Sequence, residues 1–211
     1  MHKLIDLIIH VGGLVAIVGV VFAETGLFFG FFLPGDSLLV TAGLYCTSPS
    51  PDQPPLFNIV WLNLLVMAAA IVGDTVGYWI GAKTGPRLFS REQSLFFSKK
   101  HLLRTKEFYE RHGGKTIIIA RFMPFARTFA PVVAGIGQMS YRRFLSFNVI
   151  GGIGWVFSMT MLGFLLGKAY PGITQRIEWV IIVIVFVSLL PAMISYLTNR
   201  KKVPPASNVA V

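Results

Sequence analysis

The chain has 211 residues, of which 54% are hydrophobic and only 13% are charged, and its mean hydropathy is +0.67. Soluble domains carry about a quarter charged residues, so this composition excludes an ordinary soluble domain and indicates a membrane protein. The formal net charge of +10 comes from basic residues gathered in a few loops, which makes them useful for orientation. The single Cys46 excludes an internal disulfide, and we expect no metal and no other cofactor because the sequence has no Cys/His cluster.

Four apolar stretches have the length of transmembrane helices, since a span needs about 20 mostly apolar residues. They lie at 7–23, 57–81, 144–167 and 177–198. The sequence predicts that each of them crosses the bilayer.

Two further apolar stretches, 25–46 and 116–139, are interrupted. The first contains Pro34-Gly35-Asp36, and the second contains Arg121, Pro124, Arg127 and Pro131. A proline inside a helix costs about 3 kcal/mol, and an unpaired charge at the bilayer centre costs roughly as much again. Non-helical backbone at this depth must be buried in protein or line a wet cavity. We therefore expect both stretches to be re-entrant hairpins.

The basic residues orient these segments. Nine Lys and Arg lie in the segment 83–115, whereas the loop 46–56 has none, so the positive-inside rule places 83–115 in the cytoplasm. The tail 199–211 with Arg200-Lys201-Lys202 then lies on the same side, and both termini are predicted to be cytoplasmic. Part of the basic segment has the pattern of an amphipathic helix at the membrane surface. Its charge can enforce topology or bind lipid, and the sequence leaves both open.

The two broken stretches are related by a weak internal repeat. Three motifs recur: Phe32-Leu33-Pro34 as Phe122-Met123-Pro124, Ala42-Gly43 as Ala134-Gly135, and the Gly77/Gly81 pair as Gly163/Gly167. Each unit is a hairpin followed by a span, and the hairpins open to opposite sides. The fold prediction is therefore an all-α polytopic membrane protein with four transmembrane helices and two re-entrant hairpins in an inverted repeat, an arrangement that places substrate sites near the midplane.

The repeat units carry charges of opposite sign. The first has Glu24 and Asp36, and the second has Arg121 and Arg127. Because an unpaired charge is costly at this depth, we expect both arginines to lie close to both carboxylates when the site is empty. Purely structural ion pairs are the alternative interpretation. For Asp74, a helix-packing hydrogen bond and a functional role both stay open.

Four stretches resemble the DedA family of bacterial inner-membrane proteins: ETGLFFGFFLPGDSLL, IVGDTVGYWIG, FYERHGGKTIIIARFMPFARTFAPVVAG and MSYRRFLSFNVIGGIGW. The resemblance covers roughly residues 20–170. It implies a flippase of the inner membrane that returns undecaprenyl phosphate to the inner leaflet and depends on the proton motive force. The functional residues of the family match Glu24, Asp36, Arg121 and Arg127.

The chemistry of these residues agrees with that implication. Arginine binds phosphate through paired, charge-assisted hydrogen bonds, and Thr128 and Ser37 can add hydroxyl donors. We expect Glu24 and Asp36 to take protons when the phosphate takes their arginines. No enzymatic activity is predicted, because the sequence has no nucleophile or metal arrangement. The predicted partners are a polyprenyl phosphate lipid, protons and membrane lipids, with no nucleic acid.

Other functions stay open at this point. Buried carboxylates suit a proton-coupled transporter or exchanger of a small ion equally well, and the eukaryotic relatives of the family are general phospholipid scramblases. A membrane-lipid enzyme fits less well because it would need a nucleophile or a metal cluster, and a non-transporting assembly factor fits less well because it would not need four ions at the midplane. The sequence also leaves the oligomeric state open, a homo-oligomer included.

Overall fold

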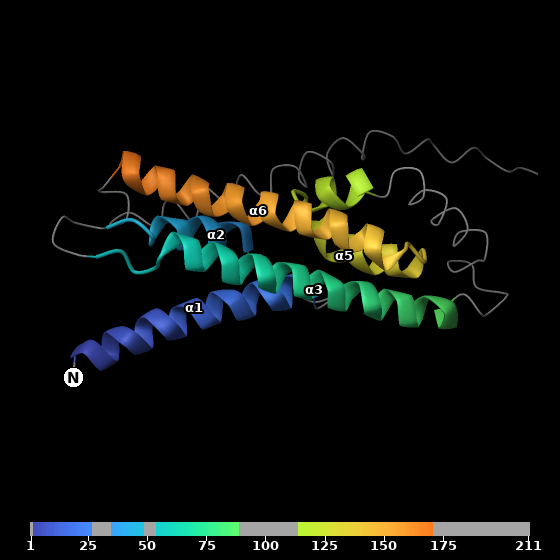
Figure 1. Ribbon diagram of the computed structural model, residues 1–211, viewed down its shortest axis with the longest axis horizontal. Helices are drawn as coiled ribbons and strands as arrows, with labels where there is room; N and C mark the ends of the chain where they lie inside the picture. Colours follow the sequence, from blue (N-terminus) through green and yellow to red (C-terminus); the bar gives the residue numbers. More distant parts are fainter. Residues whose placement is uncertain (1, 27–34, 49–53, 89–113, 171–211) are drawn as a thin grey trace, which may run out of the picture.

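The computed structural model describes residues 2–26, 35–48, 54–88 and 114–170. Within these ranges there is no strand, which confirms the all-helical prediction. The labelled helices are α1 (His2–Gly26), α2 (Gly35–Leu44), α3 (Ile59–Leu88), α5 (Pro124–Ile136) and α6 (Tyr141–Ala169) (Figure 1). Residues 114–120 form a further short helix before α5. The predicted span 177–198, most of the basic segment 83–115 and the tail 199–211 lie outside the described residues.

Helices α3 and α6 are the two long apolar helices. The stretches Ile59–Gly85 and Tyr141–Ala169 are long and apolar enough to cross a membrane, in agreement with the predictions at 57–81 and 144–167. Both helices expose large apolar side chains, among them Trp61 and Leu64 on α3 and Phe157 on α6. Such an exposed apolar surface marks a face that contacts lipid or protein, and in these membrane helices we assign it to lipid.

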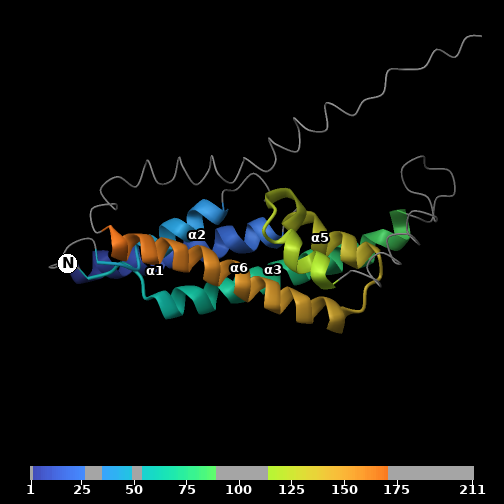
Figure 2. The ribbon, with the colours of Figure 1, turned by 90° about the horizontal axis from the view of Figure 1, so that it is seen from above.

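Helix α1 differs from its prediction. It continues to Gly26, beyond the end predicted at residue 23, so that Glu24 lies in its last turn. Figures 1 and 2 show α1 ending about halfway along α3, with α2 returning toward the end from which α1 came. The amino terminus consequently lies at the end of the molecule where α3 begins. The exposed Lys83, Lys115, Arg142 and Arg143 lie at the other end. That the amino terminus faces the cytoplasm stays a prediction.

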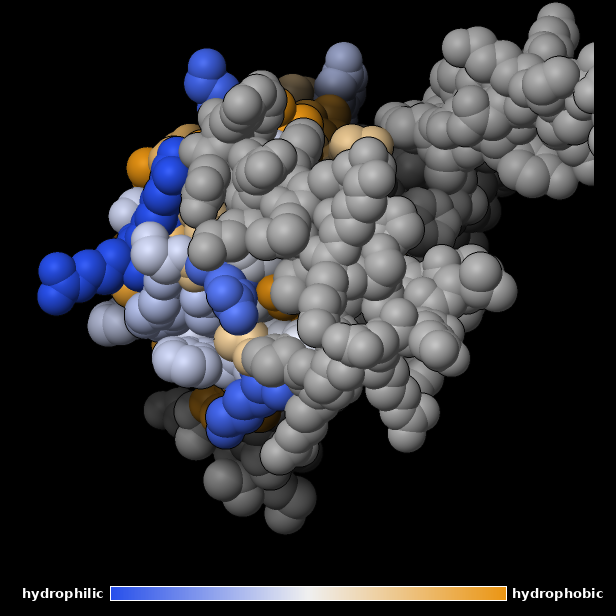
Figure 3. All heavy atoms as spheres, turned by 90° about the vertical axis from the view of Figure 1, so that its right-hand side faces the viewer, coloured by the Kyte–Doolittle hydropathy of each residue, from blue (hydrophilic) through white to orange (hydrophobic). Residues whose placement is uncertain are grey.

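The basic end is visible in the described residues. Lys83, Lys115, Arg142 and Arg143 are all exposed, and they belong to the end of α3, the beginning of the 114–120 helix and the beginning of α6. Seen from that end, long hydrophilic side chains project from the surface (Figure 3).

Where the structure describes them, both broken stretches contain a short helix. The break in the second stretch is confirmed, because the 114–120 helix ends in a turn at 121–123 and α5 then begins at Pro124, a helix position that suits proline. In the first stretch, residues 27–34 with Pro34 lie outside the described residues, and α2 begins at Gly35. At about 1.5 Å per residue, the 10 residues of α2 and the 13 of α5 are each too short for a hydrocarbon core of about 30 Å. That both stretches enter and leave on one side stays a prediction.

Each hairpin has two arms, and α2 and α5 are the second arms. Glycines allow each second arm to pack closely against the long helix of the other repeat unit. A side chain at any of four glycines would collide with a backbone carbonyl across the contact: Gly43 with Thr160, Gly163 with Val40, Gly135 with Tyr78, and Gly81 with Val132. Helix α2 therefore packs against α6, and α5 packs against α3. This exchange has the symmetry that an inverted repeat requires, but the packing makes Gly81, not Gly77, the equivalent of Gly163.

The first arms are the end of α1 and the 114–120 helix, and each packs against the long helix of its own repeat unit. A side chain at Gly26 of α1 would lie 3.1 Å from the Gly73 backbone of α3, and one at Gly151 of α6 would lie 3.4 Å from Ile118 Cα in the 114–120 helix. The described helices thus form two bodies of three helices. The first body is α1, α3 and α5, and the second body is the 114–120 helix, α2 and α6.

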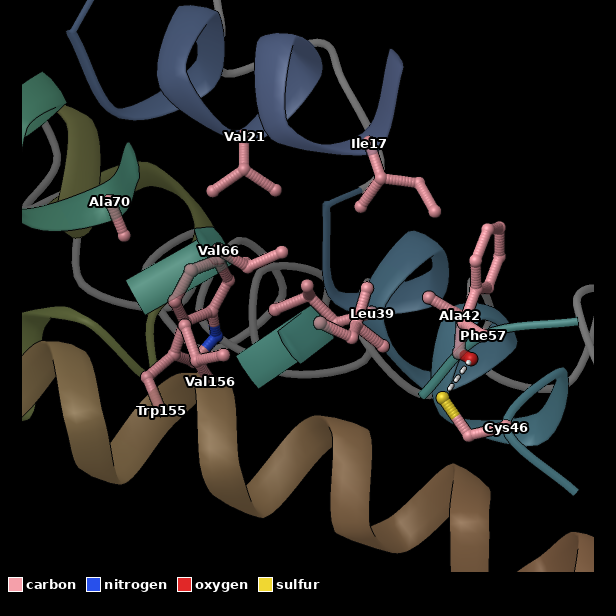
Figure 4. Close-up of a cluster of buried hydrophobic side chains, with 11 residues drawn as sticks. Ile17, Val21, Leu39, Ala42, Cys46, Phe57, Val66, Ala70, Trp155 and Val156 are labelled. Atoms are coloured by element: carbon pink, nitrogen blue, oxygen red, sulfur yellow. Dashed lines mark hydrogen bonds between the residues drawn. The ribbon is translucent and has the colours of Figure 1, made fainter. Parts of the chain in front are cut away.

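Two apolar clusters hold the bodies together. The larger contains Val21, Leu39, Val66 and Trp155 and lies between α1, α2, α3 and α6 (Figure 4). The smaller is formed by Tyr78, Ile117, Ala134, Met139 and Phe144. Along α3, Asp74 falls between the two clusters, and along α6 Asn148 does the same. A polar layer therefore separates two apolar ones. We name it the ion layer, and it consists of the hydrogen-bonded side chains Glu24, Asp36, Asp74, Arg121, Arg127 and Asn148 together with the indole N–H of Trp155.

Candidate functional site

The ion layer is closed to solvent in this conformation. Its charged members Glu24, Asp74, Arg121 and Arg127 have exposed fractions of 0%, 3%, 3% and 6%. Buried charges persist only when they are paired and hydrogen-bonded. The partners of each arginine therefore define the site.

Arg127 binds two carboxylates. Its Nη1 donates to Asp36 Oδ1 at 2.6 Å, and its Nη2 donates to Glu24. The guanidinium also lies over the Trp155 ring, 5.0 Å from the centroid, within the range of a cation–π contact. The indole Nε1 of Trp155 donates to Asp36 Oδ1 at 2.8 Å. Trp155 thus contacts both members of the Arg127–Asp36 pair.

The ends of three helices position this group. Glu24 lies in the last turn of α1 and packs against Gly35, where any side chain would overlap its carboxylate. Asp36 lies in the first turn of α2, where the helix dipole favours a negative charge. Arg127 lies in the first turns of α5, and its backbone N–H donates to the Met123 carbonyl at 3.1 Å. The breaks in the sequence therefore bring the three charges together.

Arg121 has different partners. Its Nη2 donates to Asp74 of α3 and to the Asn148 side-chain carbonyl of α6. Asn148 Nδ2 donates to the Ile71 carbonyl at 3.0 Å, which fixes the amide with its oxygen toward the guanidinium. Gly152 leaves room for this guanidinium, since a side chain there would lie 3.2 Å from Arg121 Nη1.

The expected pairing of charges is confirmed for Arg127 and is wrong for Arg121. Arg127 does lie with Glu24 and Asp36, as expected from charge pairing. Arg121 does not join them, because Asp74 supplies its counter-charge from α3. This ion pair fits both interpretations left open for Asp74, helix packing and a functional role.

Two neutral members of the layer, Asn148 and Trp155, were not predicted. They lie seven residues apart on α6, which is two helical turns and hence one face. Both are almost completely buried. The signal in the sequence is an asparagine in an otherwise apolar span at this spacing from a tryptophan.

The ion layer also contains unused hydrogen-bonding atoms. Among the described residues, four buried side-chain atoms have no partner: Arg121 Nε, Arg127 Nε, Thr128 Oγ1 and Glu24 Oε2. Three of these are donors, and all three belong to residues predicted to bind phosphate. The other predicted hydroxyl, Ser37, is buried in α2 beside Asp36. An anion would satisfy donors that are otherwise costly to bury.

These features define an all-helical membrane protein in which broken helices meet at a buried layer of ions. The sequence matches the VTT domain over residues 12–165. It is 42% identical to Protein DedA of Escherichia coli (strain K12), over 95% of each chain. It is also 45% identical to an uncharacterized membrane protein of Mycobacterium leprae, over 83% of this chain and 76% of the relative. The chain therefore belongs to the DedA family of VTT-domain membrane proteins. No solved structure matches it.

Proposed function

We propose that this protein is a proton-coupled translocase that returns undecaprenyl phosphate from the outer to the inner leaflet of the bacterial inner membrane. The observation that carries the proposal is the set of unpartnered donors on Arg121, Arg127 and Thr128, all of them buried. Guanidinium groups bind phosphate through two parallel hydrogen bonds and stay protonated. The family membership and the basic end of the molecule support this reading.

The chemical problem in this transport is the head group. An isoprenoid tail is soluble in hydrocarbon, whereas a phosphate cannot cross it without compensation for its lost hydration. A protein that shelters only the phosphate is sufficient, and the tail stays in the lipid. No covalent step is needed, so the proposal is a transporter and not an enzyme.

The carboxylates provide the proposed coupling to protons. Arg127 is shared between Glu24 and Asp36, so an incoming phosphate competes with two anions for one cation. A phosphate that wins this competition leaves the carboxylates beside another anion, and they bind protons. Loss of those protons on the cytoplasmic side restores the competition and releases the lipid.

Helices α2 and α5 are each packed on the long helix of the other repeat unit, so the groups of helices that pack together differ from the repeat units. We therefore propose that the first body moves against the second. The basic end of the molecule, with Lys83 and Arg142, faces the cytoplasm in this proposal.

A second candidate function is a proton-coupled transporter of a small ion. The Arg127 group favours this function because it has two carboxylates for one guanidinium, and the excess negative charge also suits a cation. The unpartnered donors favour an anion instead, because a cation would gain nothing from them.

Reconstitution in liposomes separates these functions. Fluorescent polyprenyl phosphate is placed in both leaflets, and a membrane-impermeant quencher then reports how fast inner-leaflet probe becomes accessible. We expect fast exchange with polyprenyl phosphate and slow exchange with a fluorescent phosphatidylcholine. Equal rates for both probes would indicate a general scramblase. No exchange of either probe, together with an ion flux, would contradict the proposal in favour of the small-ion transporter.

A further inference from the structure

The ion pairs of the ion layer divide into those within a body and those between bodies. Arg127 and Glu24 both belong to the first body, whereas Asp36 belongs to the second. Arg121 and Asn148 both belong to the second body, whereas Asp74 belongs to the first. Each arginine therefore has one partner in its own body and one aspartate in the other.

The two pairs between bodies run in opposite directions. The first body gives Arg127 to Asp36, and the second body gives Arg121 to Asp74. Both aspartates lie in the first repeat unit and both arginines in the second, so the repeat symmetry does not relate the two pairs. Each pair joins buried side chains from the two bodies, so separation of the bodies breaks both pairs.

We propose that Asp74 is a coupling residue, and that Arg121–Asp74 and Arg127–Asp36 are two latches that hold the bodies closed and that a lipid phosphate opens together. The proposal rests on the function proposed above and assigns Asp74 a role in the same transport. A phosphate that takes both arginines removes the only ion pairs between bodies among the described residues, while the pairs inside each body can remain.

The neutral members of the layer fit this scheme. When Arg127 leaves Asp36, Trp155 on the same body still donates to that carboxylate. When Arg121 leaves Asp74, Asn148 on its own body still accepts from the guanidinium. Glu24 likewise keeps its contact with Arg127 inside the first body. Three of the four charged groups in the latches thus retain a partner after opening, and Asp74 is the group that does not, within the part of the chain that the structure describes.

Val66 offers a direct readout of opening. It is fully buried on α3 and lies in the apolar cluster with Trp155 and Val156 of the second body (Figure 4). A cysteine at this position, in a chain whose own Cys46 is replaced by alanine, reacts with a small charged thiol reagent only when the bodies separate. Asp74→Asn and Asp36→Asn each open one latch with almost no change in side-chain size. Thr75→Val is the matched control, since it removes only a local bond to the Ile71 carbonyl.

The expected result is slow labelling of Val66→Cys alone, about tenfold or more faster labelling with either aspartate substitution, and no change with Thr75→Val. Polyprenyl phosphate should accelerate labelling of the parent and add little to the double variant D36N/D74N. Arg121→Gln breaks the second latch from its other side and replaces D74N if that variant does not insert.

Two results would overturn parts of the inference separately. If D36N accelerates labelling but both D74N and R121Q label at the parent rate, Asp74 is not a latch. If the aspartate variants respond and polyprenyl phosphate has no effect on the parent, the latches stand, but the lipid does not open them and the proposed function fails. No response to either variant or lipid would overturn both.

Discussion

Arg127→Lys tests whether the guanidinium shape, and not only its charge, serves phosphate binding. Lysine keeps the positive charge but has no planar fork and no flat face. In the structure Arg127 uses Nη1 and Nη2 on separate carboxylates and lies over the Trp155 ring. One ammonium group cannot reproduce these contacts, and it has no equivalent of the unpartnered Nε–H.

The size of the effect follows from the lost contacts. A hydrogen bond to a charged group contributes about 1.5–3 kcal/mol, and a buried cation–π contact contributes about 2 kcal/mol. The empty protein loses part of the same contacts, so the net loss on phosphate binding is about one charged hydrogen bond. Since about 1.4 kcal/mol is a factor of ten in Kd, R127K should weaken binding roughly 10- to 100-fold.

The assay is binding of radiolabelled polyprenyl phosphate to protein in nanodiscs. Arg143→Lys is the control, because Arg143 is exposed at the beginning of α6 and the exchange there preserves all that an exposed charge contributes. Insertion should be unchanged in both variants. Full affinity in R127K would show that Arg127 is only a counter-ion for the carboxylates, and the proposed phosphate site would be wrong.

Three further predictions concern coupling, packing and topology. Glu24→Gln should still bind polyprenyl phosphate but lose the dependence of leaflet exchange on pH between about 5 and 8; an unchanged pH profile would exclude Glu24 as a coupling group. Gly163→Val should lower the melting temperature by about 2–10 °C, because overpacking costs about 1–3 kcal/mol, whereas Gly154→Val should not, since Gly154 has nothing within 4 Å. With Cys46 removed, a cysteine at Ser48 should react with an impermeant reagent from outside intact cells, and one at Gln138 only after permeabilisation; the reverse pattern would invert the orientation.

The break in the second stretch was predictable because its causes are local. Pro124 cannot continue the preceding helix, and two arginines cannot lie unpaired in hydrocarbon. The pairing of Arg127 with Glu24 and Asp36 was predictable for the same reason, since Glu24 directly precedes the other hairpin and Asp36 lies within it. Composition, charge and the positions of the prolines are therefore enough to predict that Arg127 pairs with Glu24 and Asp36.

The partner of Arg121 depended on tertiary structure. Asp74 lies 47 residues away on a different helix, and nothing in either local sequence states which guanidinium it faces. The packing of α2 and α5 on the long helix of the other repeat unit could not be predicted for a similar reason. Glycines such as Gly81 and Gly163 predict close packing, but they do not name the helix that packs against them.

Helix α1 extends beyond the predicted stretch 7–23 and includes Glu24. Glu24 stays helical and buried, since Arg127 neutralises it inside the protein. A partner that is distant in sequence thus decided a local boundary.

Directional transport in a proton gradient tests the central claim most directly. Liposomes that contain the protein and fluorescent polyprenyl phosphate are given a pH step across the membrane, and the distribution of the probe between leaflets is followed with an impermeant quencher. We predict that the probe accumulates in the leaflet on the less acidic side, that collapse of the gradient with an ionophore reverses this, and that Asp36→Asn abolishes it. Exchange that stays symmetric in the presence of the gradient would contradict proton-coupled translocation.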